Sequence, residues 1–480
     1  MQTSIQTVKV KNDKHTQVAD TIMGMPLLLA GSSDSRSVVE SIQAAIDNPR
    51  CYDRLIVSGI DLECEIASSL QILFKHRSHP WAEIVILKSI GPIHGLLTLI
   101  LEHSKAPVNL LTLDNTIGER GVSSAIRRGL SKNRDACKLK EIALTNSCLS
   151  AWIMEDLVTG ICAHSGVRKL LCVGCEFLPR AAEILSRGLR NAPHVQEMNL
   201  YGSQIDDYDL ASIVGSCSNL TSIDIGKTIC GPKTIDRLGV LLDDSSRGKP
   251  AKCKLTSLEM NYYRHLGTVA PLRIDLTPLF QGLAQNSTLK RLTIASLSVD
   301  DRSAECLVTC LQKNDTLETM VLTDCGLSQV AMTLILENLA NFKGMRRLHL
   351  DGRQKLGLYG KQQIAEVATE ALRTKNTLLE ALPLPPGFDF YRYELDQLLD
   401  RNLAGRRMLF RTRRQDDDKM AAAQMHTEVL SNPSAVWPYV LERVNKVTLP
   451  NGSQMNPQST ESRRADMIYY MLQQRILLEN

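Results

Sequence analysis

The most regular feature of the chain is an apolar triplet with the spacing apolar-x-x-apolar-x-apolar. We number each copy from its first apolar residue, so the triplet occupies positions 1, 4 and 6. Clear copies begin at Leu139, Val167, Val195, Leu220, Leu255, Leu289, Leu317 and Met345. Weaker copies begin at Tyr52, Trp81, Val108 and Leu379.

The triplets return in phase. The step is 28 residues from Leu139 to Val167 and from Val167 to Val195, and it is 28 again between the copies at 289, 317 and 345. Steps of 34 and 35 residues elsewhere indicate insertions, for example at 243–250. A fixed period of this length is the signature of a repeat protein.

Each copy predicts a strand followed by a helix. Positions 4 and 6 alternate with polar positions, as in a strand, and the next segment changes to helical spacing, as at Cys306, Leu307, Cys310 and Leu311. One strand–helix unit cannot bury its apolar side alone, but stacked copies can. We therefore expect an α/β solenoid.

The repeat length and the strand–helix pattern resemble the ribonuclease-inhibitor class of leucine-rich-repeat proteins. The resemblance implies a horseshoe with parallel strands on the concave side and helices on the convex side. The class favours Asn or Cys at position 9. Here that position holds Ser147, Cys175, Ser203, Thr228, Tyr263, Leu297, Cys325 and Arg353. We therefore expect a degenerate side-chain ladder at the turn after each strand.

Three regions follow from the pattern. Residues 1–50 are expected to be a disordered tail, over 1–35, followed by a cap helix near Ser37–Ile46. Residues 51–385 are expected to form the solenoid, with about twelve repeats. Residues 386–480 are expected to form a helical C-terminal cap, because exposed solenoid ends need one. Its predicted helices are Tyr393–Leu403, Met420–Leu430 and Ala465–Leu478.

Short motifs in the C-terminal region resemble the corresponding region of a large family of leucine-rich-repeat proteins in marine diatoms. The matching pieces are 402–407, Val436-Trp437-Pro438 with Leu441-Glu442-Arg443, and Ile468-Tyr469-Tyr470-Met471-Leu472. The resemblance implies an intracellular protein whose partner is unknown. A cap in which Trp437 packs on the last repeat explains the same residues, and we favour that reading.

Composition narrows the class of protein. Hydrophobic residues make up 43% and aromatic residues 4% of the 480 residues, which suits an aliphatic repeat core. The net charge of +4 favours neither nucleic acid nor a membrane surface as partner. The 13 cysteines lack the spacing of a disulfide framework, and the start lacks a signal-peptide core. We expect a cytoplasmic protein, with the nucleus as an open alternative.

Nothing in the sequence marks a catalytic centre, and we expect no enzyme activity, cofactor or metal. The motifs of nucleotide loops, zinc proteases and serine hydrolases are missing. Cys172-x-x-Cys175 lacks the second cysteine pair of a zinc site, and both cysteines occupy buried positions of one repeat. They are predicted to be core residues.

The candidate binding residues come from positions 3, 5 and 7, which face the concave side when positions 4 and 6 point inward. The candidates are Glu197, Asn199, Tyr201, Asp224, Glu259, Asn261, Arg291, Arg347, His349 and Asp351. Glu197, Asp224 and Glu259 are predicted to lie near one another. Because such acids repel, a protein partner with a basic surface would relieve them.

The leading functional hypothesis is therefore a protein–protein interaction scaffold or recognition module. One alternative is an activator of a small GTPase of the Ran type, by analogy of fold alone. The other is a substrate receptor of a ubiquitin ligase, for which neither end offers a convincing adaptor-binding box. The sequence leaves the partner, the pathway and the oligomeric state open.

Overall fold

The computed structural model describes residues 25–402 apart from gaps at 31–34, 60–63, 78, 88–92, 105–106, 119–120, 133–138, 246–252, 263–271, 352–356, 375–377, 386–387, 389–390 and 401. Two compact units make up the chain. The first unit consists of residues 1–241 and 250–263, and the second of residues 242–249 and 264–480.

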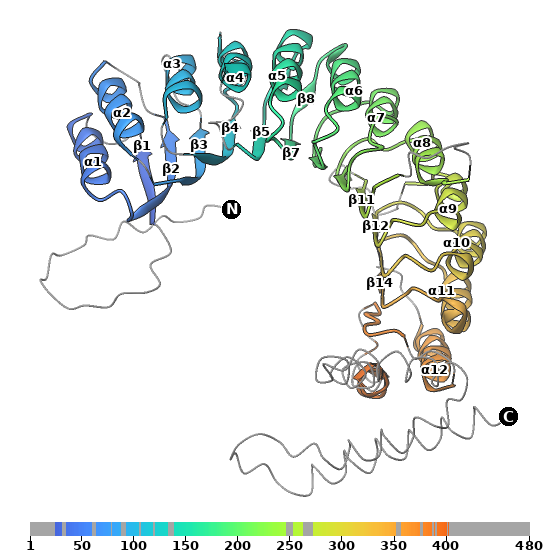
Figure 1. The fold of residues 1–480 in the computed structure, drawn as a ribbon. Coiled ribbons are helices and arrows are strands. Elements are labelled where there is room, and N and C mark those ends of the chain that lie inside the picture. Colours follow the sequence, from blue (N-terminus) through green and yellow to red (C-terminus); the bar gives the residue numbers. More distant parts are fainter. Residues whose placement is uncertain are drawn as a thin grey trace, which may run out of the picture. The chain divides into compact units, whose positions relative to one another are not determined.

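The first unit is a parallel sheet with one helix after almost every strand (Figure 1). Its main strands are β1 (Met25–Ala30), β2 (Tyr52–Ser58), β3 (Trp81–Leu87), β4 (Val108–Asp114), β5 (Glu141–Thr145), β7 (Lys169–Val173), β9 (Glu197–Asn199), β10 (Ser222–Asp224) and β11 (Ser257–Asn261). Neighbours in this order pair in parallel, so each strand lies beside the strand of the preceding repeat.

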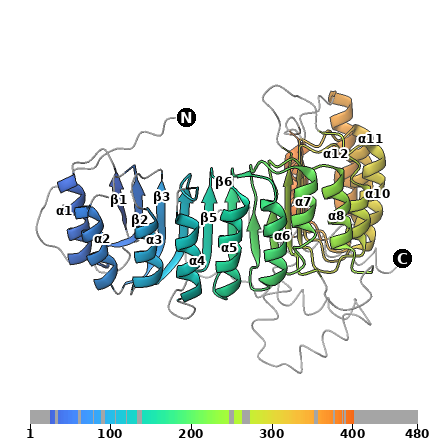
Figure 2. The same cartoon turned by 90° about the horizontal axis from the view of Figure 1, so that it is seen from above.

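The helices of the first unit form a second layer on one side of that sheet, and Figure 2 shows α1 to α6 side by side in chain order. They are α1 (Ser35–Asp47), α2 (Cys64–His76), α3 (Ile93–Thr98) with a π-helical turn (Leu99–His103), α4 (Val122–Lys132), α5 (Ala151–Ala163), α6 (Ala181–Asn191), α7 (Asp207–Val214) and α8 (Pro232–Leu242). Two short strands, β6 (Cys148–Leu149) and β8 (Glu176–Phe177), pair at the turns that follow β5 and β7.

The second unit repeats the arrangement. Its strands are β12 (Arg291–Ala295), β13 (Thr319–Thr323) and β14 (Arg347–Asp351), again parallel and in chain order. Its helices are α9 (Thr277–Ala284), α10 (Asp301–Lys313), α11 (Gln329–Glu337) with a 3₁₀ turn (Leu339–Asn341), and α12 (Leu358–Thr374). Residues 391–400 are also helical, which agrees with the helix predicted from residue 393.

The core lies between the two layers, as the triplets predict. Positions 4 and 6 are buried in every clear repeat, for example Leu170 with Cys172 and Leu292 with Ile294. Burying one such aliphatic side chain contributes about 1.5–3 kcal/mol. No helix among the described residues is both long enough and apolar enough to cross a membrane.

The turn after most strands has the same conformation, and Tyr262 after β11 is the exception among the described position-8 residues. Position 8 takes a positive φ at Gly59, Asn115, Asn146, Gly174, Gly202, Lys227, Ser296 and Asp324. This left-handed region favours glycine and, among other residues, asparagine and aspartate. Position 9 follows this turn and points back toward the core, where all seven described position-9 residues are buried.

Part of the ladder at position 9, which the sequence predicts to be degenerate, is formed by short hydroxyl and thiol groups. The Ser203 hydroxyl accepts from the Cys175 N–H at 3.1 Å and donates to the Cys172 carbonyl. Thr228 Oγ1 donates to the Ile225 carbonyl at 2.6 Å, and Cys325 Sγ donates to the Ile294 carbonyl at 3.3 Å. A short hydroxyl or thiol reaches these backbone carbonyls because the turn brings position 9 close to them.

The N-terminal prediction also changes. Residues 25–30 form β1 rather than tail, with Leu27 and Leu29 buried and Leu28 exposed. Three consecutive leucines conceal the inward–outward alternation of a strand, which is why the triplet pattern missed it. The predicted helix near Ser37–Ile46 is confirmed as α1. Residues 403–480, with the helices predicted at 420–430 and 465–478 and most of the diatom-like motifs, lie outside the described residues.

Candidate functional site

The register of the sheet aligns equivalent repeat positions of the first unit into rows. Leu171 of β7 lies opposite Asn199 of β9, Asn199 opposite Asp224, and Asp224 opposite Glu259. Neighbouring strands are about 4.8 Å apart. Positions 4 and 6 point to the helices, so rows 3, 5 and 7 lie on the opposite face, which we call the strand face.

Three predicted residues, Asn199, Asp224 and Glu259, are consecutive members of row 5. Asp224 Oδ1 accepts from the Gly226 N–H at 2.8 Å, and Asn199 Oδ1 accepts in the same way from Tyr201 at 2.8 Å. Burial raises the pKa of Asp224, although hydrogen bonds from Gly226 and from the Asn199 side chain oppose the effect. Glu259 is exposed beside it. The two carboxylates form an acidic pair on the strand face.

Glu197 does not join that pair. It belongs to row 3, where it lies opposite Ser222 and Lys169. Lys169 Nζ lies 3.4 Å from Glu197 and 3.7 Å from Glu141, so the three residues form an alternating ladder of charge. Glu197 therefore does not need a cation from a partner, because Lys169 of its own chain supplies one.

Tyr201 and Asn261 belong to row 7 and border the acidic pair. Lys227 Nζ lies 4.9 Å from the centre of the Tyr201 ring, a cation–π contact. The Lys227 N–H also donates to the Asn261 carbonyl. Gly226 leaves room for the ring, since a Cβ there would lie 2.8 Å from Tyr201 Cδ2. The polar part of the strand face therefore has an aromatic anchor of the kind favoured at protein interfaces.

The other four predicted residues belong to the second unit. Arg291 and Arg347 share row 3 there, on either side of Thr319. Arg347 Nε lies 3.9 Å from Glu380. His349 is in row 5 opposite Val321, and the backbone of Asp351 lies opposite Thr323. The ten predicted residues thus fall into two sets, one on the strand face of each unit.

Sequence reasoning missed the N-terminal part of row 5. From β1 to β7 the row consists of Leu28, Ile56, Val85, Thr112, Ala143 and Leu171. Leu28 is 48% exposed, Ile56, Val85 and Leu171 are half-buried, and Ala143 is buried. The sequence analysis assigned position 5 only in the repeats from Val195 onward. Applied to the earlier repeats, the same rule identifies every residue of this row except Leu28, because the strand of Leu28 has no triplet.

The cysteine pair is part of the core, as predicted. Cys172 and Cys175 are fully buried and both are free thiols. Burial raises the pKa of Cys175 to about 11 and also raises that of Cys172, so neither is a ready thiolate. Within the described part of the chain, no group of three or more His, Cys, Asp or Glu side chains is arranged to hold a metal ion.

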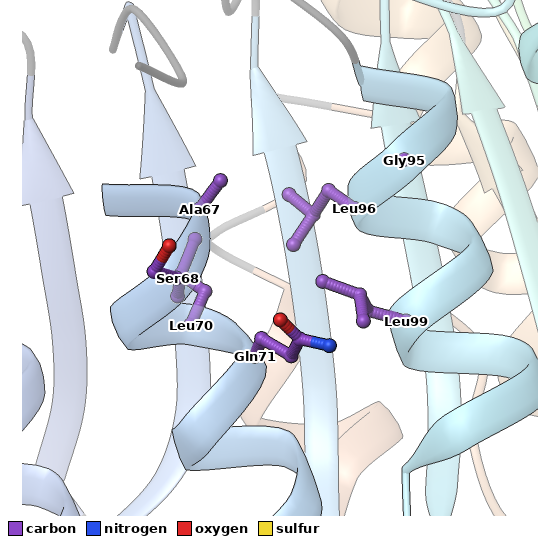
Figure 3. Close-up of a pocket in the computed structure, with 7 residues that line it drawn as sticks. All are labelled: Ala67, Ser68, Leu70, Gln71, Gly95, Leu96 and Leu99. Carbon is purple, nitrogen blue, oxygen red and sulfur yellow. The ribbon is translucent and has the colours of Figure 1, made fainter. Parts of the chain in front are cut away.

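A pocket of about 210 Å³ lies in the helix layer between α2 and α3, away from the strand face (Figure 3). It is lined by Ala67, Ser68, Leu70, Gln71, Gly95, Leu96 and Leu99. The lining is mostly aliphatic, and its polar groups are the Ser68 hydroxyl and the Gln71 amide. The lining includes no titratable acid or base that could activate the Ser68 hydroxyl.

Among the comparisons with known proteins, only the search of solved structures finds proteins similar to this chain. No protein-family model matches the chain, and no curated protein sequence matches it. A leucine-rich-repeat-containing protein, LegL7 from Legionella pneumophila, is 15% identical, with 73% of this chain and 98% of that chain covered and a TM-score of 0.38. The leiomodin-1 actin-binding site 2 is 16% identical over 43% of this chain and 96% of that one, with a TM-score of 0.28.

The C-terminal domain of tropomodulin from Caenorhabditis elegans is 12% identical, with 42% of this chain and 97% of that chain covered and a TM-score of 0.26. The fold itself is read from this chain's own elements. Parallel strands in chain order, a helix layer on one side and a repeated left-handed turn at position 8 are the features of the class. The chain has an α/β leucine-rich-repeat fold.

Proposed function

We propose that this chain is a protein-interaction module that binds a macromolecular partner on the strand face of its first unit. The observation that carries the proposal is the composition of row 5. A surface row of a monomer is ordinarily polar, but here Leu28, Ile56, Val85 and Leu171 all retain exposure to solvent. Contiguous exposed apolar side chains bordered by polar ones mark interaction surfaces.

The polar end of the row supports the same role. Asp224 and Glu259 lie opposite each other on adjacent strands, and like charges in such a pair destabilise the sheet. A cation from a partner would relieve this repulsion and would fix the partner's orientation along the row. Tyr201 lies at the neighbouring position 7 and would add an amphipathic contact.

We also propose the finer assignment of the repeats to the ribonuclease-inhibitor type, which the 28-residue steps and the helix of each repeat support. In that assignment residues 51–385 are the repeat array and 386–480 its C-terminal cap, with the strand β1 and helix α1 before the array. The role is binding rather than catalysis. We keep the cytoplasm as the proposed location, supported by the free cysteines of the described residues.

The test is partner capture with matched variants. The full chain is used as bait, and each captured protein is measured again with the double variant Asp224→Asn, Glu259→Gln. The control is Glu183→Gln, Asp236→Asn, which removes two exposed acids from helices α6 and α8. We expect a genuine partner to bind the face variant at least tenfold more weakly and the control as tightly as the wild type.

A second variant separates the two parts of the row. Ile56→Thr, Val85→Thr replaces apolar surface by polar surface at the other end of the first unit. The proposal fails if every captured protein binds both face variants with the affinity and salt dependence of the wild type. Circular dichroism of each variant checks that the fold is retained.

A further inference from the structure

From β1 to β7 row 5 is apolar at every strand except β4, where it holds Thr112. It crosses from β1 to β7 at right angles to the strands, with Leu28, Ile56 and Val85 in register at one end and Leu171 at the other. Three further apolar side chains border it, Leu110 in row 3 and Leu87 and Val173 in row 7, and each is half-buried. The row is therefore a stripe that is long across the sheet and narrow along the strands.

The repeat distance of this stripe matches that of an α-helix. Strands follow one another at about 4.8 Å, and a helix rises about 5.4 Å per turn. Apolar residues spaced three or four apart on a helix would therefore each meet a successive strand. The stripe is about 24 Å long, which about 16 helical residues cover at about 1.5 Å per residue.

Rows 3 and 7 set the charge on either side of the stripe. From β1 to β7 they carry three carboxylates against two cations among the described residues, and Glu197 follows on β9. The carboxylates along the stripe are Glu83, Asp114 and Glu141, and the cations are Arg54 and Lys169. Both cations already have acidic neighbours, since Arg54 Nε lies 4.0 Å from Glu83 and Lys169 lies between Glu141 and Glu197. The flanks therefore have an acidic excess.

Two more cations lie near the stripe but outside these rows. Lys140 and Arg168 occupy position 2, at the edge where strands β5 and β7 begin. Arg168 Nη1 donates to the His194 carbonyl at 3.2 Å, which holds it at that edge. Within rows 3 and 7 themselves the excess remains acidic.

We propose that this stripe binds an amphipathic helix of a partner protein, with the apolar side of the helix on row 5 and basic residues on its flanks. The inference rests on the proposed function and names the partner's chemistry. Burial of the exposed apolar side chains drives association, and the acidic flanks select a basic helix over an acidic one. Asp224 and Glu259 lie beyond Leu171 and would meet a basic group at the end of the helix.

The test uses a defined probe and the full chain. The probe is a fluorescent, stapled 18-residue helix with leucine at positions 2, 5, 9, 12 and 16, lysine on the flanks and alanine elsewhere. Matched peptides carry glutamate for lysine, or the same residues in scrambled order. We expect fluorescence anisotropy to show that the lysine helix binds at least tenfold more tightly than the glutamate helix or the scrambled peptide. Its preference over the glutamate helix should shrink as the salt concentration rises.

Variants locate the site. The double variant Ile56→Thr, Val85→Thr keeps the β-branched shape of two side chains that are neighbours in register. It should lower the affinity for the lysine helix at least tenfold. The control Val321→Thr, Val330→Thr makes similar changes at half-buried and exposed positions of the second unit and should leave binding unchanged. Hydrogen exchange should show protection of β2 to β4 in the complex.

Four outcomes would overturn the proposal. The first is equal affinity for the lysine, glutamate and scrambled peptides, and the second is unchanged affinity of the Ile56, Val85 variant. The third is a dimer of the wild type that the same variant abolishes, since a second copy would then occupy the stripe. The fourth is a cross-link from a photoreactive residue at position 85 to residues 1–24 or 403–480 of the same chain.

Failure here and failure of the proposed function are distinguishable. If the lysine helix does not bind but a captured partner is lost with Asp224→Asn, Glu259→Gln, then the strand face is an interface and the helical occupant is wrong. If no captured partner responds to either face variant, the interaction role of the face is wrong as well.

Discussion

Leu171 of β7 and Asn199 of β9 lie opposite each other in register, and row 5 changes from apolar to polar between them. The next members of the row are Asp224 and Glu259. A partner that covers both sides of this boundary must therefore offer an apolar surface next to a basic group. Most protein surfaces do not combine these two features, so this requirement narrows the class of partner.

Asp207, the first residue of α7, provides a prediction on stability and pH. Its carboxylate accepts from the backbone N–H groups of Gly231 at 2.8 Å, Lys233 at 2.9 Å and Thr234 at 3.0 Å, at the start of α8 in the next repeat. Replacing Asp207 by Ala leaves these donors without the carboxylate. We expect a loss of about 1–2 kcal/mol in the free energy of unfolding at pH 7, the usual scale for a helix N-terminal cap.

The loss should depend on pH. Burial alone would raise the pKa of Asp207, but the hydrogen bonds from Thr234, Lys233 and Gly231 outweigh it and lower the pKa below 3.8. A carboxylate with a lowered folded-state pKa stabilises above its unfolded value and loses that effect as pH falls through the folded value. The difference between the wild type and Asp207→Ala, measured by urea unfolding, should therefore shrink below about pH 4. A constant difference from pH 7 to pH 2 would contradict this account, and Asp236→Ala serves as control.

The left-handed turn predicts which substitutions position 8 tolerates. Gly202 has a φ of +70°, and the equivalent residues two and three repeats earlier are Asn146 and Asn115. A Cβ at Gly202 would meet only the backbone of Gly174, at 3.8 Å. Gly202→Asn should therefore cost little, whereas Gly202→Val should lower stability by about 1–2 kcal/mol because a β-branched residue disfavours this conformation. Thermal unfolding of the two variants measures this difference in stability, and equal melting temperatures would refute the argument.

The position-9 ladder predicts a role for Ser203. Its hydroxyl joins two buried backbone groups, the Cys175 N–H and the Cys172 carbonyl. Ser203→Ala should cost about 1–3 kcal/mol, because an unsatisfied buried donor keeps its full desolvation penalty. Ser222→Ala, on the strand face, removes the same atom from a half-buried position and should cost less. Chemical denaturation compares them, and an equal loss in both variants would argue against the ladder.

The thiols should differ in reactivity. The Cys148 thiol is exposed and donates to the Glu176 carboxylate at 3.1 Å, and this hydrogen bond is the main reason that its pKa is raised. Glu176→Gln should lower that pKa and speed alkylation of Cys148 at pH 8, because the thiolate is the reacting form. Cys172 and Cys175 should stay unmodified in the folded protein. Peptide mass spectrometry after iodoacetamide treatment measures both, and a slower reaction of Cys148 in the variant would contradict the assignment.

The sequence by itself determined the repeat, the strands of the clear triplets and the burial of their positions 4 and 6. Those features depend on alternation within one segment, which can be read locally. It also placed Cys172 and Cys175 in the core, because both fall on buried repeat positions. Even so, three consecutive leucines in β1 hid the alternation and left that strand unpredicted.

The tertiary structure alone decided which side chains meet across strands. Each strand-face residue has its neighbours one repeat away, so the pairing of Lys169 with Glu197 and the opposition of Asp224 and Glu259 depend on register. The same register aligns Ile56, Val85 and Leu171 in one row from three separate repeats. The position-8 turn likewise brings the Ser203 hydroxyl to the backbone of the preceding repeat, a contact between atoms 28 and 31 residues apart in the chain.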